Sequence, residues 1–154
     1  MKTLVVFYSR SGNTKKIAEK ISDKMKSDIE ELIDIKNRKG LFGWFSAVRD
    51  ARSKKLTTIN VIKNDPAKYG LVIIGTPIWA GLMAPAVRTY INQNKAKFKN
   101  VAFFCTYIGS GDLKAFNDME DFTGMTPVSK FGLREKELNT NHEDKLNNFI
   151  KSIK

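Results

Sequence analysis

Cysteine, histidine and proline are scarce in this sequence, and long apolar runs are missing. Its 154 residues include one cysteine, Cys105, one histidine, His142, and four prolines. A single cysteine excludes a disulfide framework and a cysteine-rich zinc site, so we expect Cys105 to be a small core residue. No apolar run has the length of a membrane span, and the first one ends at Ser9, too early for a signal peptide. These absences predict a soluble cytoplasmic protein without a metal centre.

Acidic residues are also few, because basic residues outnumber them by 27 to 16 and give a net charge of +11. Residues 1–64 carry 15 basic and 7 acidic residues, a difference of +8, whereas residues 65–154 carry 12 and 9, a difference of +3. Such a charge attracts nucleic acid, anionic membranes or acidic proteins. No nucleic-acid-binding motif accompanies it. We therefore expect no nucleic-acid partner, and both an acidic protein partner and a merely solvated basic surface remain open.

Short apolar runs alternate with amphipathic segments along the whole chain, residues 1–154, which we interpret as one domain. Runs without polar alternation are typical of buried parallel strands. Strands are expected at residues 4–8, 29–35, 69–75, 99–105 and 126–133. Helical spacing of apolar residues separates them, at residues 14–25, 85–91, 113–119 and 146–153. This alternation predicts an α/β fold with three layers, in which helices cover both faces of a five-stranded parallel sheet of order 2-1-3-4-5.

A basic, aromatic insert occupies residues 36–58, between the second and third expected strands. Within it, Leu41, Trp44, Phe45 and Val48 share one helical face and basic residues surround them. One interpretation is a crossover helix whose apolar face packs on the sheet, because parallel strands need a crossover. The other is an amphipathic element that contacts a membrane surface or a partner, or acts as a lid. We favour the crossover.

Polar residues next to the expected helices predict how those helices begin. If the first loop is an ordinary strand-to-helix turn, a serine or asparagine of residues 9–13 would cap the first helix; Ser110 or Asp112 is a candidate cap for the helix that follows the fourth strand. Thr140-Asn-His-Glu143 has the pattern of a capping box for the last helix. This pattern places His142 in an exposed first turn.

Three loops rich in glycine, hydroxyl groups and aromatics follow the first, third and fourth strands, at residues 9–14, 76–81 and 106–111. In the expected strand order these loops meet at the carboxyl ends of the strands, where ligands bind in such sheets. The first loop leads into a helix and offers amides and short side chains that can hold a phosphate without a lysine. An ordinary strand-to-helix turn is the alternative. No catalytic acid–base pair stands out, so no catalytic residue is predicted.

These loops carry a resemblance to the flavodoxin family. Residues 8–14, Tyr-Ser-Arg-Ser-Gly-Asn-Thr, resemble the family's FMN phosphate loop. Residues 76–81 follow a glycine-ended strand and resemble its second flavin loop, which often carries a tryptophan, and residues 101–111 are similar to its next strand and third loop. The resemblance covers nearly the whole chain. It implies the flavodoxin-like α/β/α sandwich and FMN as the cofactor.

The resemblance also implies roles for individual residues. Ser9, Ser11, Asn13 and Thr14 would hold the phosphate together with loop amides, and Trp79 would stack on the isoalloxazine ring. Arg10 would lie near the phosphate or point to solvent, and Tyr107 would be a second ring contact. The Ala80–Gly81 peptide would be the one that flips on flavin reduction. The implied cofactor contacts are Ser9, Arg10, Ser11, Gly12, Asn13, Thr14, Thr76, Pro77, Ile78, Trp79, Ala80, Gly81, Thr106, Tyr107, Gly109, Ser110 and Gly111.

The function that the family implies is electron transfer between protein partners, by a carrier rather than a stand-alone enzyme. The alternatives are an FMN-dependent NAD(P)H or quinone oxidoreductase, and a flavin-free binding module that kept the fold. A phospho-acceptor receiver domain is excluded because Ser9 and Thr76 stand where its acidic residues would be. The net charge predicts an acidic redox partner, and its expected contacts are Arg38, Lys39, Arg49 and Arg52.

Overall fold

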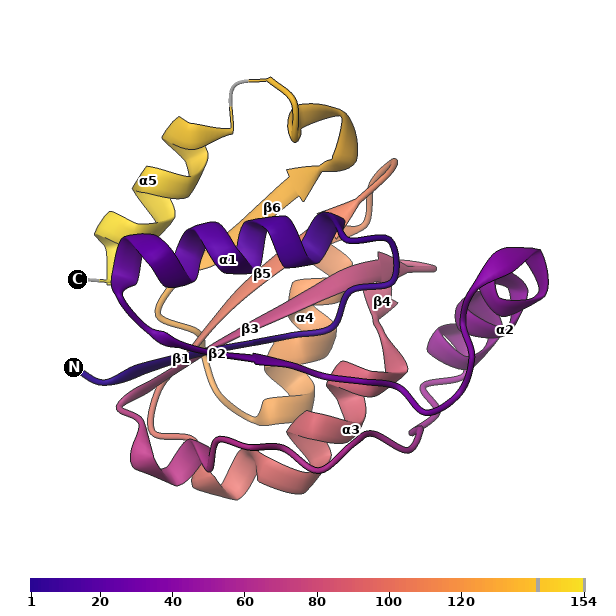
Figure 1. Ribbon diagram of the computed structural model, residues 1–154, viewed down its shortest axis with the longest axis horizontal. Coiled ribbons are helices and arrows are strands. Elements are labelled where there is room, and N and C mark those ends of the chain that lie inside the picture. Colours follow the sequence, from indigo (N-terminus) through magenta and orange to yellow (C-terminus); the bar gives the residue numbers. More distant parts are fainter. Residues whose placement is uncertain (141, 154) are drawn as a thin grey trace.

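The computed structural model describes residues 1–140 and 142–153, which form a twisted sheet with helices on both faces (Figure 1). The strands are β1 (Thr3–Phe7), β2 (Asp28–Glu31), β3 (Leu71–Trp79), β4 (Leu82–Met83), β5 (Val101–Tyr107) and β6 (Lys130–Arg134). The α-helices are α1 (Asn13–Met25), α2 (Gly40–Arg52), α3 (Pro85–Asn94), α4 (Asp112–Thr123) and α5 (Glu143–Ile153). Short 3₁₀ helices occupy Pro66–Lys68, Lys95–Lys97 and Glu135–Glu137.

The sheet has the order β2-β1-β3-β5-β6, with every neighbouring pair parallel. This confirms the predicted α/β fold and its five parallel strands in the predicted order. Every residue of β1 is buried, which explains why its sequence shows no polar alternation. The two-residue strand β4 pairs antiparallel with the end of β3. The sequence did not predict β4.

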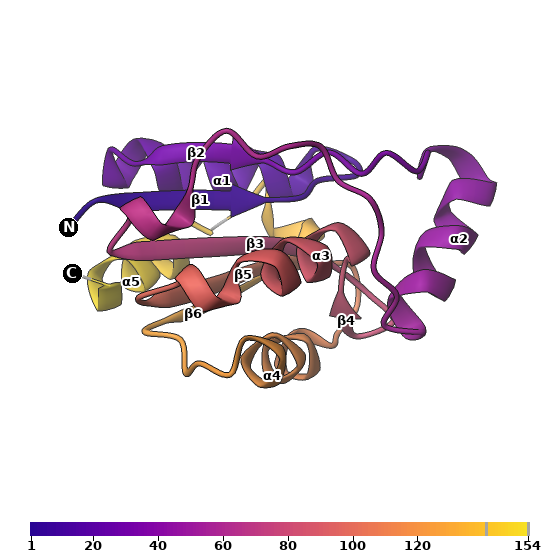
Figure 2. The same ribbon diagram turned by 90° about the horizontal axis from the view of Figure 1, so that it is seen from below.

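Helices α1 and α5 cover one face of the sheet, and α3 and α4 cover the other (Figure 2). On the first face, Ile17 and Ile21 of α1 share a core with Leu146 of α5 and Phe7 of β1. The predicted apolar stripe of α3 is confirmed, because Ala86, Val87, Tyr90 and Ile91 are all buried. The helix predicted at residues 113–119 is present as part of α4, in which Phe116 and Met119 are buried and Leu113 is exposed.

All five predicted strands differ from their predicted bounds, β1 by one residue at each end and the others by more. Strand β2 ends at Glu31 because residues 33–35 pair instead with the chain that returns from α2. The Ile35 amide donates to the Thr58 carbonyl at 3.0 Å, and the Asn60 amide donates to the Ile33 carbonyl at 3.0 Å. Strand β5 runs two residues past Cys105, and β6 begins at Lys130 rather than at residue 126. Cys105 is fully buried, as predicted.

Glycine precedes both helices for which a polar cap was predicted. Gly12 (φ 94°) precedes α1 and Gly111 (φ 112°) precedes α4, and neither helix has a side-chain cap. None of the candidate serine, asparagine and aspartate side chains therefore caps α1 or α4. The chain enters each helix through a left-handed residue, a conformation that glycine adopts without steric cost.

The start of α5 also differs from its prediction. His142 is only 6% exposed, and the Lys20 Nζ atom of α1 lies 2.6 Å from its Nε2 atom. The prediction that His142 is exposed is therefore wrong. The capping box predicted at residues 140–143 includes Asn141, which lies outside the described residues.

Helix α2 stands at the carboxyl end of the sheet and does not cover a face of it (Figure 1). Its buried residues are Gly43, Ala47, Asp50 and Ala51, while Leu41, Phe42 and Phe45 are exposed. The prediction of a crossover helix that packs its large apolar face on the sheet is therefore wrong. The extended chain after α2 supplies the crossover packing instead, because its Ile59 and Ile62 lie against the core.

Gly75 and Phe104 are a closely packed pair of register partners in the parallel ladder of β3 and β5. A Cβ atom at Gly75 would lie 2.0 Å from the Cζ atom of the Phe104 ring. No other residue fits at position 75 without moving that buried ring. Directly beyond this pair, the two strands lead into the loops of the candidate site.

Candidate functional site

The loop after β1 turns back on itself before α1. The Gly12 amide donates to the Ser9 Oγ atom at 3.0 Å, which fixes the turn. Because no side chain caps α1, the amides of its first turn keep their hydrogen-bonding capacity for a ligand. A Cβ atom added at Gly12 would meet no heavy atom within 4 Å, so the space outside the turn is open. An open helix N-terminus of this kind suits an anion.

Thr14 differs from its neighbours in this loop because its side chain is buried. Its Oγ1 atom lies 2.8 Å from the Oγ1 atom of Thr106 at the end of β5. This buried hydrogen bond ties the start of α1 to the strand two places along in the sheet. The Thr14 hydroxyl therefore positions the loop from beneath, while Ser11 is exposed on its outer side.

The segment predicted as the second loop is mostly strand. Strand β3 continues through Trp79, and Ala80 and Gly81 form the turn of a hairpin with β4. Both turn residues have positive φ, 53° and 75°, as a type I′ hairpin turn requires. The Ala84 amide donates a hydrogen bond to the Thr76 hydroxyl at 3.0 Å, which ties the hairpin to the start of α3. Trp79 is thus held on a paired strand rather than on a free loop.

Trp79 lies against Tyr8, with ring centroids 5.7 Å apart and planes at 87°, an edge-to-face pair. Burial raises the pKa of Tyr8 to about 12, with Asp34 adding to the shift. The Tyr8 phenol is therefore neutral at physiological pH. Together these two side chains build a rigid aromatic corner at the end of β1 and β3.

The loop after β5 meets the hairpin turn directly. A Cβ atom at Gly111 would lie 3.1 Å from the Cα atom of Gly81, so glycine allows the two turns to touch. Tyr107 is buried at the end of β5, and burial, followed by the nearby Asp112 carboxylate, raises its pKa. The second and third loops therefore form one continuous wall.

A cavity of about 310 Å³ opens between these elements. Predicted contact residues from all three loops line it: Arg10, Ser11, Pro77, Ile78, Trp79, Ala80, Gly81, Thr106, Tyr107, Gly109 and Ser110. The other predicted contacts do not line this cavity: Ser9, Gly12, Asn13, Thr14, Thr76 and Gly111. Ser9 faces a smaller neighbouring cavity of about 180 Å³, which Arg10 and Lys39 also line.

Four residues that line the main cavity were missed by the sequence reasoning, namely Trp44, Val48, Ile108 and Glu135. Trp44 and Val48 come from α2, and the excess of aromatic residues in the insert was the signal that could have indicated them. Ile108 lies inside the predicted third loop. Glu135 follows β6 and carries no sequence signal, because only the parallel pairing of β6 with β5 brings it near the site.

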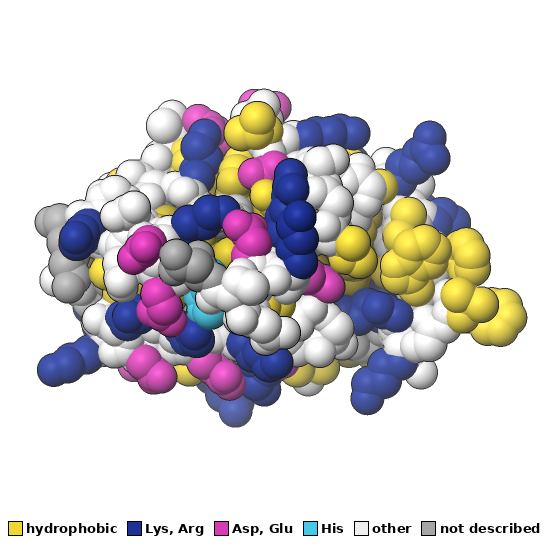
Figure 3. Space-filling view, turned by 90° about the horizontal axis from the view of Figure 1, so that it is seen from above, with side chains coloured by type: hydrophobic (Ala, Val, Ile, Leu, Met, Phe, Trp, Pro, Cys, Tyr) yellow, Lys and Arg dark blue, Asp and Glu magenta, His cyan; other side chains and the backbone are white. Residues whose placement is uncertain are grey.

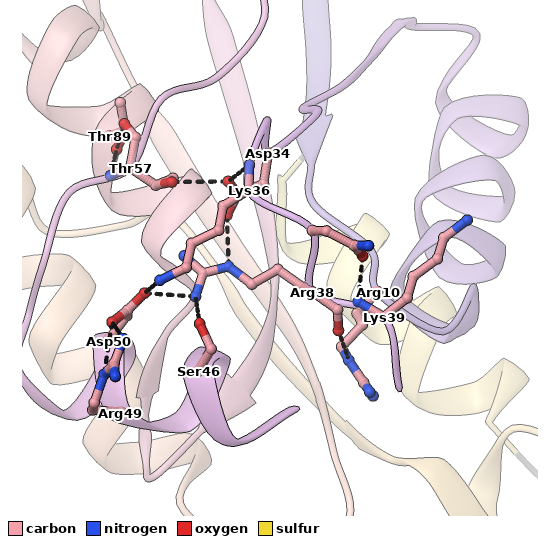
Figure 4. A network of polar contacts seen from close by, with 11 residues as sticks. Arg10, Asp34, Lys36, Arg38, Lys39, Ser46, Arg49, Asp50, Thr57 and Thr89 are labelled. Atoms are coloured by element: carbon pink, nitrogen blue, oxygen red, sulfur yellow. Dashed lines mark hydrogen bonds and ion pairs between the residues drawn. The ribbon is translucent and has the colours of Figure 1, made fainter. Parts of the chain in front are cut away.

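A cluster of charged residues links α2 to the rest of the site (Figure 4). The Arg38 guanidinium donates from Nε to Asp34 at 3.0 Å and from Nη1 to Asp50 of α2 at 2.7 Å. Burial alone would raise the pKa of Asp50, but hydrogen bonds from Lys36, Arg38 and Arg49 hold it below its ordinary value. The Asp50 carboxylate is therefore kept ionised beside Arg38.

Arg10 joins the first loop to the start of α2. Its guanidinium donates to the Arg38 carbonyl at 2.8 Å and to the Gly40 carbonyl at 3.2 Å. The side chain is therefore engaged by backbone carbonyls, and it still lines the cavity.

Comparisons with known proteins agree with this geometry. A family model described as flavodoxin matches residues 2–153. The structure of a flavoprotein in complex with FMN from Lactobacillus acidophilus NCFM has 27% identity and a TM-score of 0.75, covering 95% of this chain and 98% of the other. The apo form of the flavoprotein from that organism, determined by NMR, has 26% identity and a TM-score of 0.65, with coverages of 94% and 96%.

A further similar structure, oxidised flavodoxin 2 from Bacillus cereus, supports the fold alone. It has 16% identity and a TM-score of 0.64, and it covers 99% of this chain and 97% of the other. A comparison with curated proteins finds no match.

Two classes of feature are missing from the part of the chain that the structure describes. No three His, Cys, Asp or Glu side chains come together there as a metal site would require. None of the described helices combines the length and hydropathy of a membrane span.

Proposed function

Because the chain belongs to the flavodoxin family, we propose that it binds FMN in the cavity at the carboxyl ends of β1, β3 and β5. One observation carries the proposal: residues from three loops far apart in sequence line a single cavity, beside an uncapped helix N-terminus. This is where ligands bind in sheets of this topology.

The residues present fit the two ends of FMN. The amides at the start of α1, with the hydroxyl of Ser11, suit a phosphate, because the helix dipole and free N–H groups both favour negative charge. Trp79, Pro77 and Ile78 offer an apolar wall to the flat ring. Bound FMN supplies one- and two-electron chemistry that protein side chains lack.

We propose that the protein carries electrons between other proteins. Two charged residues line the cavity, Arg10 and Glu135. Arg10 lies in the loop after β1 and Glu135 follows β6, so they are not neighbours on one element that could act as an acid–base pair. The competing function is an FMN-dependent NAD(P)H or quinone oxidoreductase. Rapid reduction of the FMN-loaded protein by NADH or NADPH would favour the enzyme, whereas reduction only by a protein such as reduced ferredoxin would favour the carrier.

The surface around α2 suits an acidic protein partner. Hydrophobic side chains gather at the end of the molecule formed by α2, with Lys and Arg side chains beside them (Figure 3). Lys39, Arg49 and Arg52 are exposed there. Arg38 is only 4% exposed, so its predicted role as a partner contact is wrong, because it is engaged by Asp34 and Asp50.

Titration of the apoprotein with FMN and with riboflavin tests the cofactor proposal. We expect FMN to bind more tightly, and we expect Ser11→Ala to weaken FMN by about tenfold while leaving riboflavin nearly unchanged, because a hydrogen bond to a charged group contributes about 1.5–3 kcal/mol. Ser152→Ala in α5, outside the cavity, is the matched control. Equal affinity of the wild-type protein for both ligands would show that the first loop does not hold a phosphate.

A further inference from the structure

Helix α2 divides its apolar residues between the cavity and solvent. Trp44 and Val48 line the cavity, and Trp44 is 41% exposed. Phe42 is 89% exposed and does not line it. The insert therefore contributes one aromatic ring and one aliphatic side chain to a site otherwise built from loops of the sheet.

Burial of apolar side chains contributes little to the packing of α2 against the rest of the protein. Its buried apolar face consists of glycine and alanine, at Gly43, Ala47 and Ala51. Alanine methyl groups bury far less area than leucine or phenylalanine side chains, so their contribution is small. Something else must place Trp44 at the cavity.

The buried cluster around Arg38 supplies this placement. Arg38 contacts Asp50 of α2 with one nitrogen and Asp34 with another, and all three side chains are nearly inaccessible to solvent. Asp34 is fixed in turn by the Thr57 hydroxyl, which donates to its Oδ1 atom at 2.8 Å. A displaced α2 would leave these buried charges without partners, which is strongly unfavourable. The cluster therefore fixes the position of the helix.

Close packing at Gly43 adds a steric constraint. A Cβ atom there would lie 2.3 Å from the carbonyl carbon of Arg38 and 2.6 Å from its oxygen. The first turn of α2 thus packs directly on the backbone of Arg38. The side chain of the same Arg38 pairs with Asp50 in the last turn of the helix. Arg10 contacts the same carbonyl from the first loop.

From these contacts we propose that α2 is a wall of the flavin site, that Trp44 contacts the isoalloxazine ring, and that Arg38 is the positioning residue that holds Trp44 there. The proposal rests on FMN binding in the cavity. It assigns the basic, aromatic insert a second task besides partner binding.

Titration of Trp44 variants with FMN and riboflavin tests the ring contact. Trp44→Ala should weaken both ligands by the same factor, roughly tenfold, because an aromatic ring contact is lost and the phosphate site is untouched. Trp44→Phe should restore most of the affinity. Phe42→Ala is the matched control, because Phe42 is an exposed aromatic residue of the same helix and does not line the cavity.

Flavin fluorescence at saturation gives a readout that a purely structural role would not change. A tryptophan in contact with the ring quenches flavin emission, so both Trp44→Ala and Trp44→Phe should be brighter than wild type and Phe42→Ala should not. If wild type binds FMN but Trp44→Ala matches Phe42→Ala in both readouts, the ring contact is refuted. If wild type binds neither flavin, the proposed function itself fails.

Two further variants test the positioning role without changing Trp44. Gly43→Ala forces the first turn of α2 away from Arg38, and Arg38→Lys keeps the charge but cannot reach both carboxylates with a planar fork. Both should weaken FMN and riboflavin equally and raise flavin fluorescence, as Trp44→Ala does, with an unchanged far-UV circular dichroism spectrum. Folded variants that bind and quench like wild type would refute the positioning role.

Discussion

Asp50 is the group whose removal should most clearly expose how α2 is held. The substitution Asp50→Asn keeps the size of the side chain and removes its charge. In the native protein this carboxylate accepts from Lys36 at 2.6 Å, from Arg38 at 2.7 Å and from Arg49 at 3.2 and 3.3 Å. The asparagine retains one acceptor oxygen, but its amide group faces donors that it cannot satisfy.

The magnitude follows from how exposed each partner is. The side chains of Arg49 and Lys36 are 66% and 43% exposed, so solvent screens their pairs and they contribute little. The Arg38 pair is buried, and removing one member of such a pair costs about 3–5 kcal/mol. Because asparagine still accepts one hydrogen bond, we expect the lower end, about 3 kcal/mol. A domain of this size loses about 2–4 °C in Tm per kcal/mol, so Tm should fall by roughly 6–12 °C.

Urea and thermal unfolding, followed by far-UV circular dichroism, measure this change. Asp121→Asn is the matched control, because Asp121 is an exposed residue of α4, and surface substitutions of this kind stay within about 0.5 kcal/mol. Hydrogen exchange at residues 36–55 should rise in Asp50→Asn and not in the control. If the two variants unfold at the same urea concentration, the ion cluster does not hold α2.

The pH dependence gives a second check on the same group. Because the folded pKa of Asp50 is lowered, its contribution is fully present above its unfolded pKa of about 3.9 and is lost as the pH falls through the folded value. The stability difference between wild type and Asp50→Asn should therefore stay constant between about pH 7 and pH 5 and shrink below about pH 4. A difference that grows on acidification would contradict the sign of this shift.

Other predictions concern the site and the partner. Trp79→Ala should weaken FMN by about tenfold in titrations while the apoprotein keeps its far-UV spectrum; an unfolded apoprotein would show that Trp79 serves the core instead. Thr14→Val removes the buried bond to Thr106 and should lower the free energy of unfolding in urea by about 1–2 kcal/mol. Joint charge reversal by Lys39→Glu and Arg52→Glu should slow electron transfer with an acidic partner in stopped-flow experiments at low salt. Lys151→Glu in α5, at the other end of the molecule (Figure 1), should not slow it, and a rate indifferent to ionic strength would contradict the docking proposal.

The sheet and the meeting of the three loops could be predicted because their signals are local. Unbroken apolar runs mark strands that are buried on both faces, as Leu4–Phe7 shows. Glycine and hydroxyl residues directly after such strands mark the ligand end of the sheet. The structure brings Arg10, Trp79 and Tyr107 to one cavity, although the pattern that pointed to them uses only neighbours in sequence.

The features that could not be predicted depend on contacts between distant residues. The hairpin turn has Ala80 at a positive φ, whereas type I′ turns that can be recognised from sequence usually have asparagine or aspartate at that position. The helical pattern of α2 shows which side is apolar but not what covers the other side. Which side of α2 faces the protein follows from Arg38, which pairs with Asp50 across 12 residues of chain. His142 is buried and contacts Lys20, 122 residues away in the sequence.

The fit between Gly75 and Phe104 has a consequence for how this site can vary among relatives. The Phe104 ring fills the space where a side chain at position 75 would lie, so the two positions share one volume. A larger residue at position 75 requires a smaller one at position 104 if the packing density is to be kept. The two positions should therefore covary in an alignment of relatives. The strands lead into the candidate site directly beyond this pair, so the constraint lies in the core beneath the site and not in its lining.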